Sequence, residues 1–239
     1  MKSMNDSGYN ARLFSGGLRG YLHLARFRWL QYEIRRLGFS YESVIELGCF
    51  DGKLIEFLPW QPKRYVGFDS NWEGGLDLAL QKWQQFPQYS FVKACVPEDM
   101  SLEEGDSFDI AVIMETLEHV VPESVDDYLR KIEEHTKGYV FITVPNEKGI
   151  VFLVKWLAKK LLFKDARQYS LPELFNATLG RMHKVKRFQH KGFDYSALVR
   201  EVEHHFELVR VSGHPMGFLP TWLCFGVGIV GRTRSDSAA

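Results

Sequence analysis

The segment SVIELGCFDGKLIEFL, residues 43–58, decides the fold class of this chain. It begins with an apolar run typical of a buried parallel strand, turns at Gly48 and Gly52, and continues with a helical pattern that ends near Pro59. Glycine lets a backbone turn sharply and approach a ligand closely. A strand, a glycine turn and a helix in this order predict a nucleotide-like cofactor at the carboxyl end of the strand.

The rest of the chain alternates in the same way. Further apolar strands are predicted at 64–69, 89–95, 108–114 and 139–145, with helical patterns between most of them. Two last strands, at 206–213 and 225–232, have no helix between them, which predicts an antiparallel pair at one edge. The expected fold is therefore an α/β fold: a doubly wound, mostly parallel, seven-stranded Rossmann-like sheet with an antiparallel edge strand and a helical insertion after the fifth strand.

Composition excludes some classes of partner. The chain has 239 residues, and its 30 basic side chains balance its 30 acidic ones, so it has no net field to attract nucleic acid. Its 3 cysteines show no metal-ligand spacing and are expected to be reduced thiols. No apolar run is long enough for a transmembrane helix, and the N-terminus lacks the pattern of a signal peptide. We expect a cytoplasmic protein without a metal ion and without a nucleic-acid partner.

Acidic residues surround the glycine turn. Glu46 and Asp51 flank it, and Asp69 follows at the offset of about 20 residues at which a carboxylate meets ribose hydroxyls. Carboxylates repel a pyrophosphate and favour a cationic amino group, and Phe50 replaces a glycine of the dinucleotide motif. These residues favour S-adenosylmethionine over a nicotinamide dinucleotide. The alternative without a ligand is an ordinary turn in which Asp69 caps the next helix.

Four segments resemble class I S-adenosylmethionine-dependent methyltransferases and are similar to the ubiquinone-biosynthesis O-methyltransferases. They are IELGCFDG at 45–52, YVGFDSN at 65–71, FDIAVIMETLEHV at 108–120 and YVFITVPN at 139–146. Their order is that of the family. The resemblance implies S-adenosyl-L-methionine as cofactor and a methyltransferase activity, with O-methylation of a small-molecule or lipid-linked acceptor as the expected reaction.

The resemblance also implies which residues bind the cofactor. Glu46 is expected to orient its methionine end and Asp69 to bind both ribose hydroxyls. Adenine is expected beside Ala94 and Cys95, where the usual acid is absent and Glu98 or Asp99 can compensate. The complete predicted set is Glu46, Gly48, Cys49, Phe50, Asp51, Gly52, Asp69, Ser70, Ala94, Cys95, Met114 and Glu115.

Two histidines are candidates for a catalytic base. His190 precedes a predicted helix, near where the family often places a histidine on the acceptor side, and His119 follows Glu118 after the fourth strand. A sulfonium is an activated methyl donor, so alignment is the chief requirement, and a base is needed only where the acceptor proton must leave early. Contact with the acceptor or a structural role are the alternatives for both histidines.

The domain organisation follows from these positions. Residues 1–39 are expected to form an N-terminal segment and helix that cap the acceptor side. Residues 40–239 are expected to form the S-adenosylmethionine-binding domain, with a helical lid or insertion at about 147–194.

Within this insertion, residues 149–164 predict a basic amphipathic helix, which can be a lid, a homodimer interface or a peripheral contact with the inner face of the membrane. On a helical wheel, one face holds Ile150, Val154, Leu157, Ala158 and Leu161, and the other Lys155, Lys159, Lys160 and Lys164.

Two other functions remain open at this point. A noncatalytic module could bind S-adenosylmethionine, or keep the fold for protein interaction, because intact cofactor residues do not prove turnover. A nicotinamide-dependent oxidoreductase is disfavoured by Phe50 and by the acids around the turn.

Overall fold

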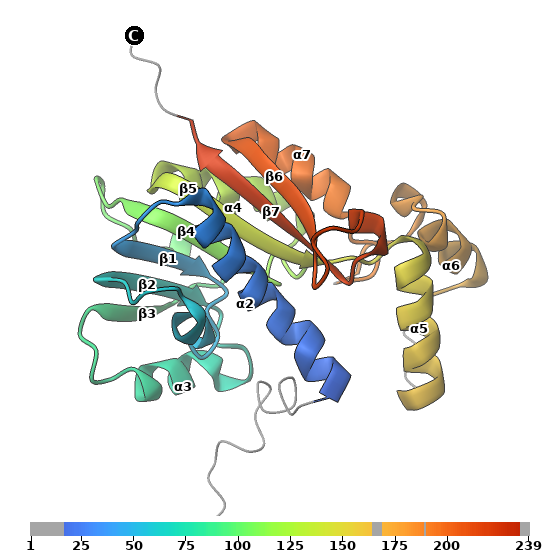
Figure 1. The fold of residues 1–239 in the computed structure, drawn as a ribbon, viewed down its shortest axis with the longest axis horizontal. Coiled ribbons are helices and arrows are strands. Elements are labelled where there is room, and N and C mark those ends of the chain that lie inside the picture. Colours follow the sequence, from blue (N-terminus) through green and yellow to red (C-terminus); the bar gives the residue numbers. More distant parts are fainter. Residues whose placement is uncertain (1–16, 164–168, 189, 235–239) are drawn as a thin grey trace, which may run out of the picture.

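The computed structural model describes residues 17–163, 169–188 and 190–234. Seven strands form one sheet in the order β3-β2-β1-β4-β5-β7-β6 (Figure 1). The first five are parallel, and β7 runs antiparallel to both β5 and β6, so the predicted α/β fold is confirmed. The strands are β1 (Ser43–Leu47), β2 (Arg64–Asp69), β3 (Tyr89–Lys93), β4 (Phe108–Met114), β5 (Thr136–Pro145), β6 (Phe206–His214) and β7 (Gly226–Thr233).

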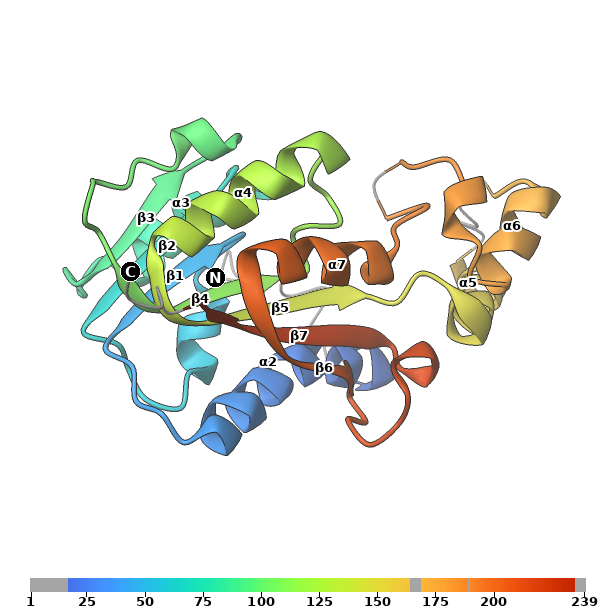
Figure 2. The same cartoon turned by 90° about the horizontal axis from the view of Figure 1, so that it is seen from above.

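Helices cover both faces of the sheet (Figure 2). Helices α4 (Pro122–Glu134) and α7 (Tyr195–His205) pack on one face, and α2 (Gly17–Leu37) and α3 (Gly75–Lys82) pack on the other. Successive side chains of a strand point to opposite faces. Glu46 in β1 therefore points to the same face as Val44, the face covered by α2.

The insertion after β5 forms a separate small unit. Helices α5 (Gly149–Phe163) and α6 (Leu171–Thr178) project beyond the end of β5 (Figures 1 and 2). They enclose their own cluster of buried residues: Phe152, Ala177, Met182 and Val185. The boundaries predicted for the insertion and for the N-terminal cap stay predictions, and residues 1–16, 164–168 and 189 of these segments lie outside the described residues.

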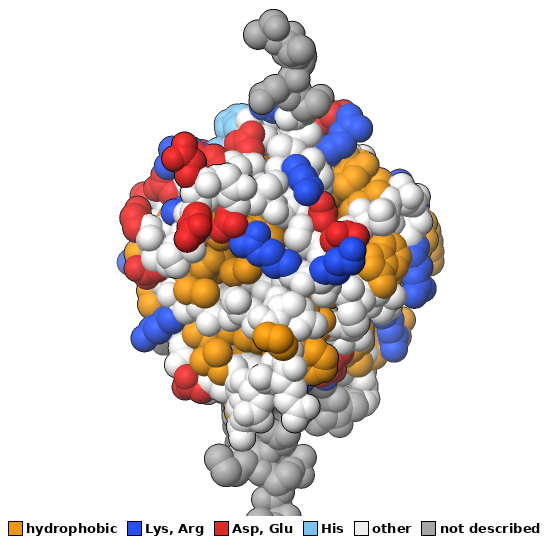
Figure 3. All heavy atoms as spheres, turned by 90° about the vertical axis from the view of Figure 1, so that its left-hand side faces the viewer, with side chains coloured by type: hydrophobic (Ala, Val, Ile, Leu, Met, Phe, Trp, Pro, Cys, Tyr) orange, Lys and Arg blue, Asp and Glu red, His pale blue; other side chains and the backbone are white. Residues whose placement is uncertain are grey.

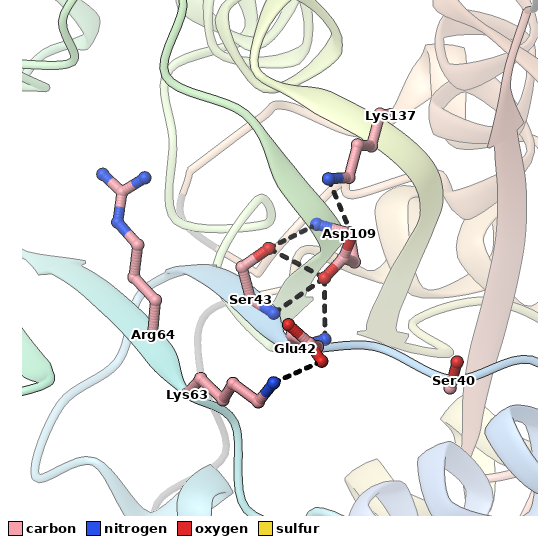
Figure 4. Close-up of a pocket in the computed structure, with 7 residues that line it drawn as sticks. All are labelled: Ser40, Glu42, Ser43, Lys63, Arg64, Asp109 and Lys137. Atoms are coloured by element: carbon pink, nitrogen blue, oxygen red, sulfur yellow. Dashed lines mark hydrogen bonds and ion pairs between the residues drawn. The ribbon is translucent and has the colours of Figure 1, made fainter.

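A hollow at the amino-terminal edge of the sheet is organised by Asp109 (Figure 4). One oxygen of its carboxylate accepts hydrogen bonds from the backbone amides of Glu42 and Ser43, at 2.7 and 2.8 Å, and the other contacts Lys137 at 3.0 Å. Burial opposes the charge of Asp109, but these hydrogen bonds outweigh it and lower its pKa. The hollow is lined by Ser40, Glu42, Ser43, Lys63, Arg64, Asp109 and Lys137.

This edge is not where a doubly wound sheet binds its ligand. Ligands of such sheets lie at the carboxyl ends of the strands, and the hollow lies at the opposite end. The face of the molecule seen from this side carries both signs of charge, interspersed with hydrophobic side chains (Figure 3). We therefore interpret Asp109 as a structural clamp between β1, β4 and β5.

Replacement of Asp109 by alanine tests this interpretation. The variant leaves the amides of Glu42 and Ser43 without their acceptor, so the free energy of unfolding should fall by roughly 2–3 kcal/mol. Urea unfolding measures this change. Cofactor affinity of the folded variant should equal that of the wild type, and a parallel loss of affinity would contradict the structural role.

Candidate functional site

The turn after β1 is built from residues with positive φ. The values are 81° at Gly48, 45° at Phe50 and 68° at Gly52. The amide of Gly48 donates to the carbonyl of Phe68 at 2.7 Å, which ties the turn to β2. A Cβ at Gly48 would lie 2.0 Å from Oγ1 of Thr116, so only glycine fits between the two loops. The sequence predicted the role of this glycine but not its partner Thr116.

Phe50 adopts a conformation that glycine would favour. A left-handed backbone costs an L-residue roughly 1–2 kcal/mol. Two features hold it in place: its amide donates to Oδ2 of Asp69 at 3.0 Å, and its ring packs against Gly75, where a Cβ would lie 2.3 Å from a ring atom. The exposed ring of Trp72 lies nearby, with centroids 6.3 Å apart. The aromatic pair is thus fixed at the edge of the turn.

Asp69 at the end of β2 links the two loops of the site. Oδ2 accepts from the amide of Phe50, and Oδ1 accepts from the amide of Asn71 at 2.8 Å. Each carboxylate oxygen has two lone pairs, so each can accept one further hydrogen bond. This capacity is sufficient for a pair of vicinal hydroxyls, and binding of the ribose by Asp69 stays a prediction. The adjacent Ser70 is exposed at the same strand end.

Glu46 is a buried acid beside the turn. Its carboxylate accepts a short hydrogen bond from the hydroxyl of Tyr65. Burial raises the pKa of Glu46 to about 8, and the carboxylates of Asp51 and Asp69 contribute to the rise. A cationic group placed here would favour the ionised form. Cys49 is buried in the same region, and burial together with Glu46 raises the pKa of its thiol.

The loop after β3 is shaped by Asp99. Its Oδ2 accepts from the amides of Cys95 and Val96, at 2.8 and 3.2 Å, while the amide of Ala94 donates to the carbonyl of Asp69 at 2.9 Å. Asp99 therefore stabilises the loop where adenine was predicted, and Glu98 is exposed beside it.

The end of β4 brings a second, half-buried acid to the site. Met114 is buried, and Glu115 follows it with a φ of 52° and an amide that donates to Thr143 at 2.8 Å. Burial raises the pKa of Glu115, whereas Arg26 and Lys155 oppose this rise. The strand order places β4 beside β1, so Glu115 and the glycine turn lie at one edge of the sheet.

Arg26 was not recognised from the sequence as a site residue. It lies on α2 and acts electrostatically on Glu46 as well as on Glu115. A signal was present, because Arg26 follows Leu22 and precedes Leu30 by four residues, on the apolar face of the predicted helix. A basic residue on a buried face indicates a polar site beneath it.

His214 at the end of β6 was also missed. It is buried, and neither ring nitrogen has a hydrogen-bond partner among the described residues. Burial, together with Arg26 and Lys155, lowers the pKa of His214 to about 3, so its imidazole is neutral. The neutral ring therefore has one donor and one acceptor that the described residues do not use.

The two predicted histidines lie together. The ring centroids of His119 and His190 are 4.2 Å apart, and Nδ1 of His190 lies 3.9 Å from Oε1 of Glu118. Glu118 is fully buried, which the sequence did not indicate. The structure thus joins the loop after β4 to the insertion through these three residues.

Comparison with known proteins gives the family. Residues 21–198 match the family described as "Methyltransferase domain". This chain belongs to the methyltransferase domain family. Membership makes S-adenosylmethionine the cofactor, as the sequence predicted. The likeness to ubiquinone-biosynthesis enzymes remains a prediction, and no curated protein matches the chain.

Solved structures share the fold of this methyltransferase. An S-adenosylmethionine-dependent methyltransferase from Clostridium acetobutylicum ATCC 824 has a TM-score of 0.63 at 11% identity, over 89% of this chain and 92% of that one. Magnesium protoporphyrin IX methyltransferase from Synechocystis PCC 6803, with bound SAH, has a TM-score of 0.55 at 13% identity, over 93% and 92%. N-methyltransferase NodS from Bradyrhizobium japonicum WM9, in complex with SAH, has a TM-score of 0.56 at 12% identity, over 94% and 96%.

Helix α5 of the methyltransferase exposes most of its predicted apolar face. Its wheel face of Ile150, Val154, Leu157, Ala158 and Leu161 is largely exposed, with Leu161 81% exposed, while Phe152 packs inward. Phe152 and Trp156, on the flank of that face, supply the packing within the insertion. The role of this helix as a lid, a homodimer interface or a membrane contact stays a prediction.

Lys155 also departs from the helical wheel. Its ammonium donates to the carbonyl of Asn146 at 3.0 Å and pairs with Glu147 at 2.8 Å, so it faces the site and not the outer basic face. Lys164 lies outside the described residues.

The raised pKa of Glu46 predicts a pH dependence of cofactor binding. Ionised Glu46 is unfavourable in the empty site, so its contribution to stability falls as pH rises from its usual pKa of 4.5 towards 8. The ammonium of the cofactor favours the ionised form, so affinity should be roughly tenfold weaker near pH 6.5 than near pH 8.5. Calorimetric titration measures this change. Glu46→Gln should remove the dependence, and an equal slope in that variant would assign it to another group.

Proposed function

We propose that this methyltransferase methylates an oxygen atom of a small-molecule or lipid-linked acceptor. The single observation that carries the proposal is the exposed apolar surface of the insertion, next to the carboxyl ends of the strands. An exposed apolar surface beside the site suits an acceptor with an apolar body or tail. Bound S-adenosylmethionine supplies a methyl group that is already activated on a sulfonium.

The residues present fit this cofactor. Glycines at the turn leave room for close backbone approach, and Asp69 has lone pairs for two hydroxyls. Glu46 offers a negative charge to the amino group, and Arg26 offers a positive charge to the carboxylate of the methionine end. The amino group and the carboxylate of the methionine end thus each face a side chain of opposite charge.

Buried His214 and half-buried Phe225 and Lys155 suit the acceptor. His214 offers one donor and one acceptor in a site that burial keeps dry, and the ring of Phe225 lies 4.6 Å from the ammonium of Lys155. These side chains can orient an acceptor oxygen and exclude water. The catalytic roles predicted for His190 and His119 remain predictions.

We also propose that the insertion contacts an anionic lipid surface. The exposed apolar face of α5, with Ile150, Val154, Leu157, Ala158 and Leu161, is called the apolar stripe. Helix α6 adds exposed Leu171 and Phe175 and is followed by exposed Leu179, with Leu171 82% exposed. Residues 149–163 contain three lysines and no acid. None of the helices described combines the length and apolarity needed to cross a bilayer. A peripheral position at the inner face of the membrane follows from this proposal, and a homodimer that covers the stripe is the competing outcome.

Vesicle flotation tests the lipid contact. The wild type should float with anionic vesicles, and Val154→Glu with Leu161→Glu should reduce the bound fraction by roughly tenfold, because two charges enter the apolar stripe. Leu80→Glu is the matched control, since Leu80 is 50% exposed on α3, away from the insertion. Equal flotation of all three proteins would refute the contact. A wild type that stays in solution as a dimer would favour the homodimer.

The transfer reaction is tested with S-adenosylmethionine that carries a deuterated methyl group. Purified protein is incubated with membrane-lipid and aqueous metabolite fractions, and labelled products are detected by mass spectrometry. An oxygen-linked labelled methyl group in the lipid fraction supports the proposal, with Asp69→Ala as the inactive reference. Cofactor binding without any labelled product in either fraction would favour the noncatalytic module.

A further inference from the structure

Glu118 is a buried carboxylate with unmet hydrogen-bonding capacity. Its side chain is 0% exposed, and neither carboxylate oxygen has a hydrogen-bond partner among the described residues. Leaving a buried polar group unsatisfied costs about 1–3 kcal/mol, and more when it is charged. The carboxylate therefore requires either a proton or a cation.

Two imidazoles stand beside this carboxylate on loops that backbone hydrogen bonds hold in place. The amide of His119 donates to Thr116 at 2.9 Å in the turn after β4. His190 lies in a tight turn that Phe188 and Lys191 close by exchanging backbone hydrogen bonds of 2.9 and 3.0 Å. The three side chains thus converge from two parts of the chain that are far apart in sequence.

We propose that Glu118, His119 and His190 bind a divalent transition-metal ion. One ligand atom from each residue lies within 4.8 Å of the others. Ligands of a metal at about 2.1 Å lie roughly 3–3.5 Å apart, so small side-chain rotations bring these atoms into range. Two imidazoles and one carboxylate suit manganese, iron, cobalt or zinc better than magnesium or calcium. This proposal replaces the expectation from sequence that the protein has no metal site.

Among the described residues, the Glu118 carboxylate has an ion-pair contact with His190, whose Nδ1 lies 3.9 Å from Oε1. Arg187 also lies close, but its Nη2 donates to the backbone carbonyl of Glu118 at 2.8 Å. Arg26 favours the charge of Glu118 electrostatically, and Glu115 disfavours it. An ion bound here would balance the carboxylates at this end of β4.

A second cluster of histidine and carboxylate side chains in the described chain, around His205, is less suited to a metal ion. His205 lies between two carboxylates, with Nδ1 2.8 Å from Glu133 and Nε2 2.9 Å from Asp126. Both ring nitrogens are already used by these contacts, so His205 has no lone pair to offer a metal. Glu118 differs because its oxygens have no such partners.

The position of the ion suggests its use, and this step rests on the proposed function. Three protein ligands leave coordination positions open, and an acceptor hydroxyl that occupies one of them loses its proton to solvent more readily. His119 and His190 would then act as ligands and not as bases. The metal site itself does not depend on this role.

The test measures metal binding without cofactor or acceptor, so a failure of methyl transfer does not affect it. Metal-free protein is titrated with Mn²⁺, followed by the electron paramagnetic resonance signal of the free ion, and with Co²⁺, followed by visible absorption. One ion per chain is expected. Glu118→Gln and His190→Asn should each weaken binding at least about tenfold. His183→Asn, an exposed histidine of the insertion, should leave it unchanged.

Folding of each variant is checked by circular dichroism. His119→Asn, on an exposed ring, carries the test if Glu118→Gln does not fold. Absence of stoichiometric binding by the wild type overturns the proposal. Wild-type affinity in folded Glu118→Gln or His190→Asn overturns it as well.

Discussion

Replacement of Gly48 by alanine is expected to abolish cofactor binding and to destabilise the protein strongly. The residue has a φ of 81°, and the new Cβ would lie 2.0 Å from Oγ1 of Thr116. The unfavourable backbone and the clash together should lower the free energy of unfolding by roughly 2–5 kcal/mol. Affinity for S-adenosylmethionine should fall more than about 100-fold, because the turn must move. Urea unfolding and calorimetry measure the two effects.

Two further variants separate the clash from the backbone cost. Gly38→Ala introduces the same side chain at a φ of 67° with no atom within 4 Å, so only the conformational cost should appear. Combining Gly48→Ala with Thr116→Gly removes the clashing side chain and should restore about 1–3 kcal/mol. If the double variant is no more stable than Gly48→Ala alone, Thr116 is not what confines the turn.

Replacement of Asp69 by alanine is expected to weaken cofactor binding at least about 100-fold, because two charge-assisted hydrogen bonds contribute roughly 1.5–3 kcal/mol each. The variant also loses the acceptor for the amides of Phe50 and Asn71, which disorders the edge of the turn. Calorimetric titration with S-adenosylmethionine measures the affinity.

The control is Asp77→Ala, which removes an exposed acid from the nearby helix α3 and should bind the cofactor as the wild type does. Circular dichroism verifies that both variants are folded. Binding by folded Asp69→Ala within about threefold of the wild type would place the cofactor elsewhere.

The sheet could be predicted from sequence because local patterns determine it. The strand at residues 110–114 is apolar on both faces, and parallel strands with intervening helices have few stable arrangements. The sequence also showed that Phe50 is unusual, because a glycine is expected at this position. The sequence could not show that its backbone is left-handed, since this depends on Asp69 and Gly75 holding it in place.

Contacts between distant segments could not be predicted. Thr116 limits Gly48, and Arg26 influences Glu46 and Glu115, only because different elements meet at one end of the sheet. Periodicity identifies which residues share a helix face, but it does not show what that face packs against. For α5 the predicted wheel was correct in part, yet the face with Leu161 points to solvent and Lys155 points inward.

The place of β7 has a consequence for synthesis of the protein on the ribosome. Although β7 follows β6 in the chain, it lies between β5 and β6 and pairs with both. The cofactor end, formed by β1 to β4, can therefore assemble early, whereas β6 has no place in the sheet until residues 226–233 have emerged. A chain that stops before Gly226 leaves the apolar edge of β5 without its neighbour, which makes nascent or truncated forms prone to aggregate.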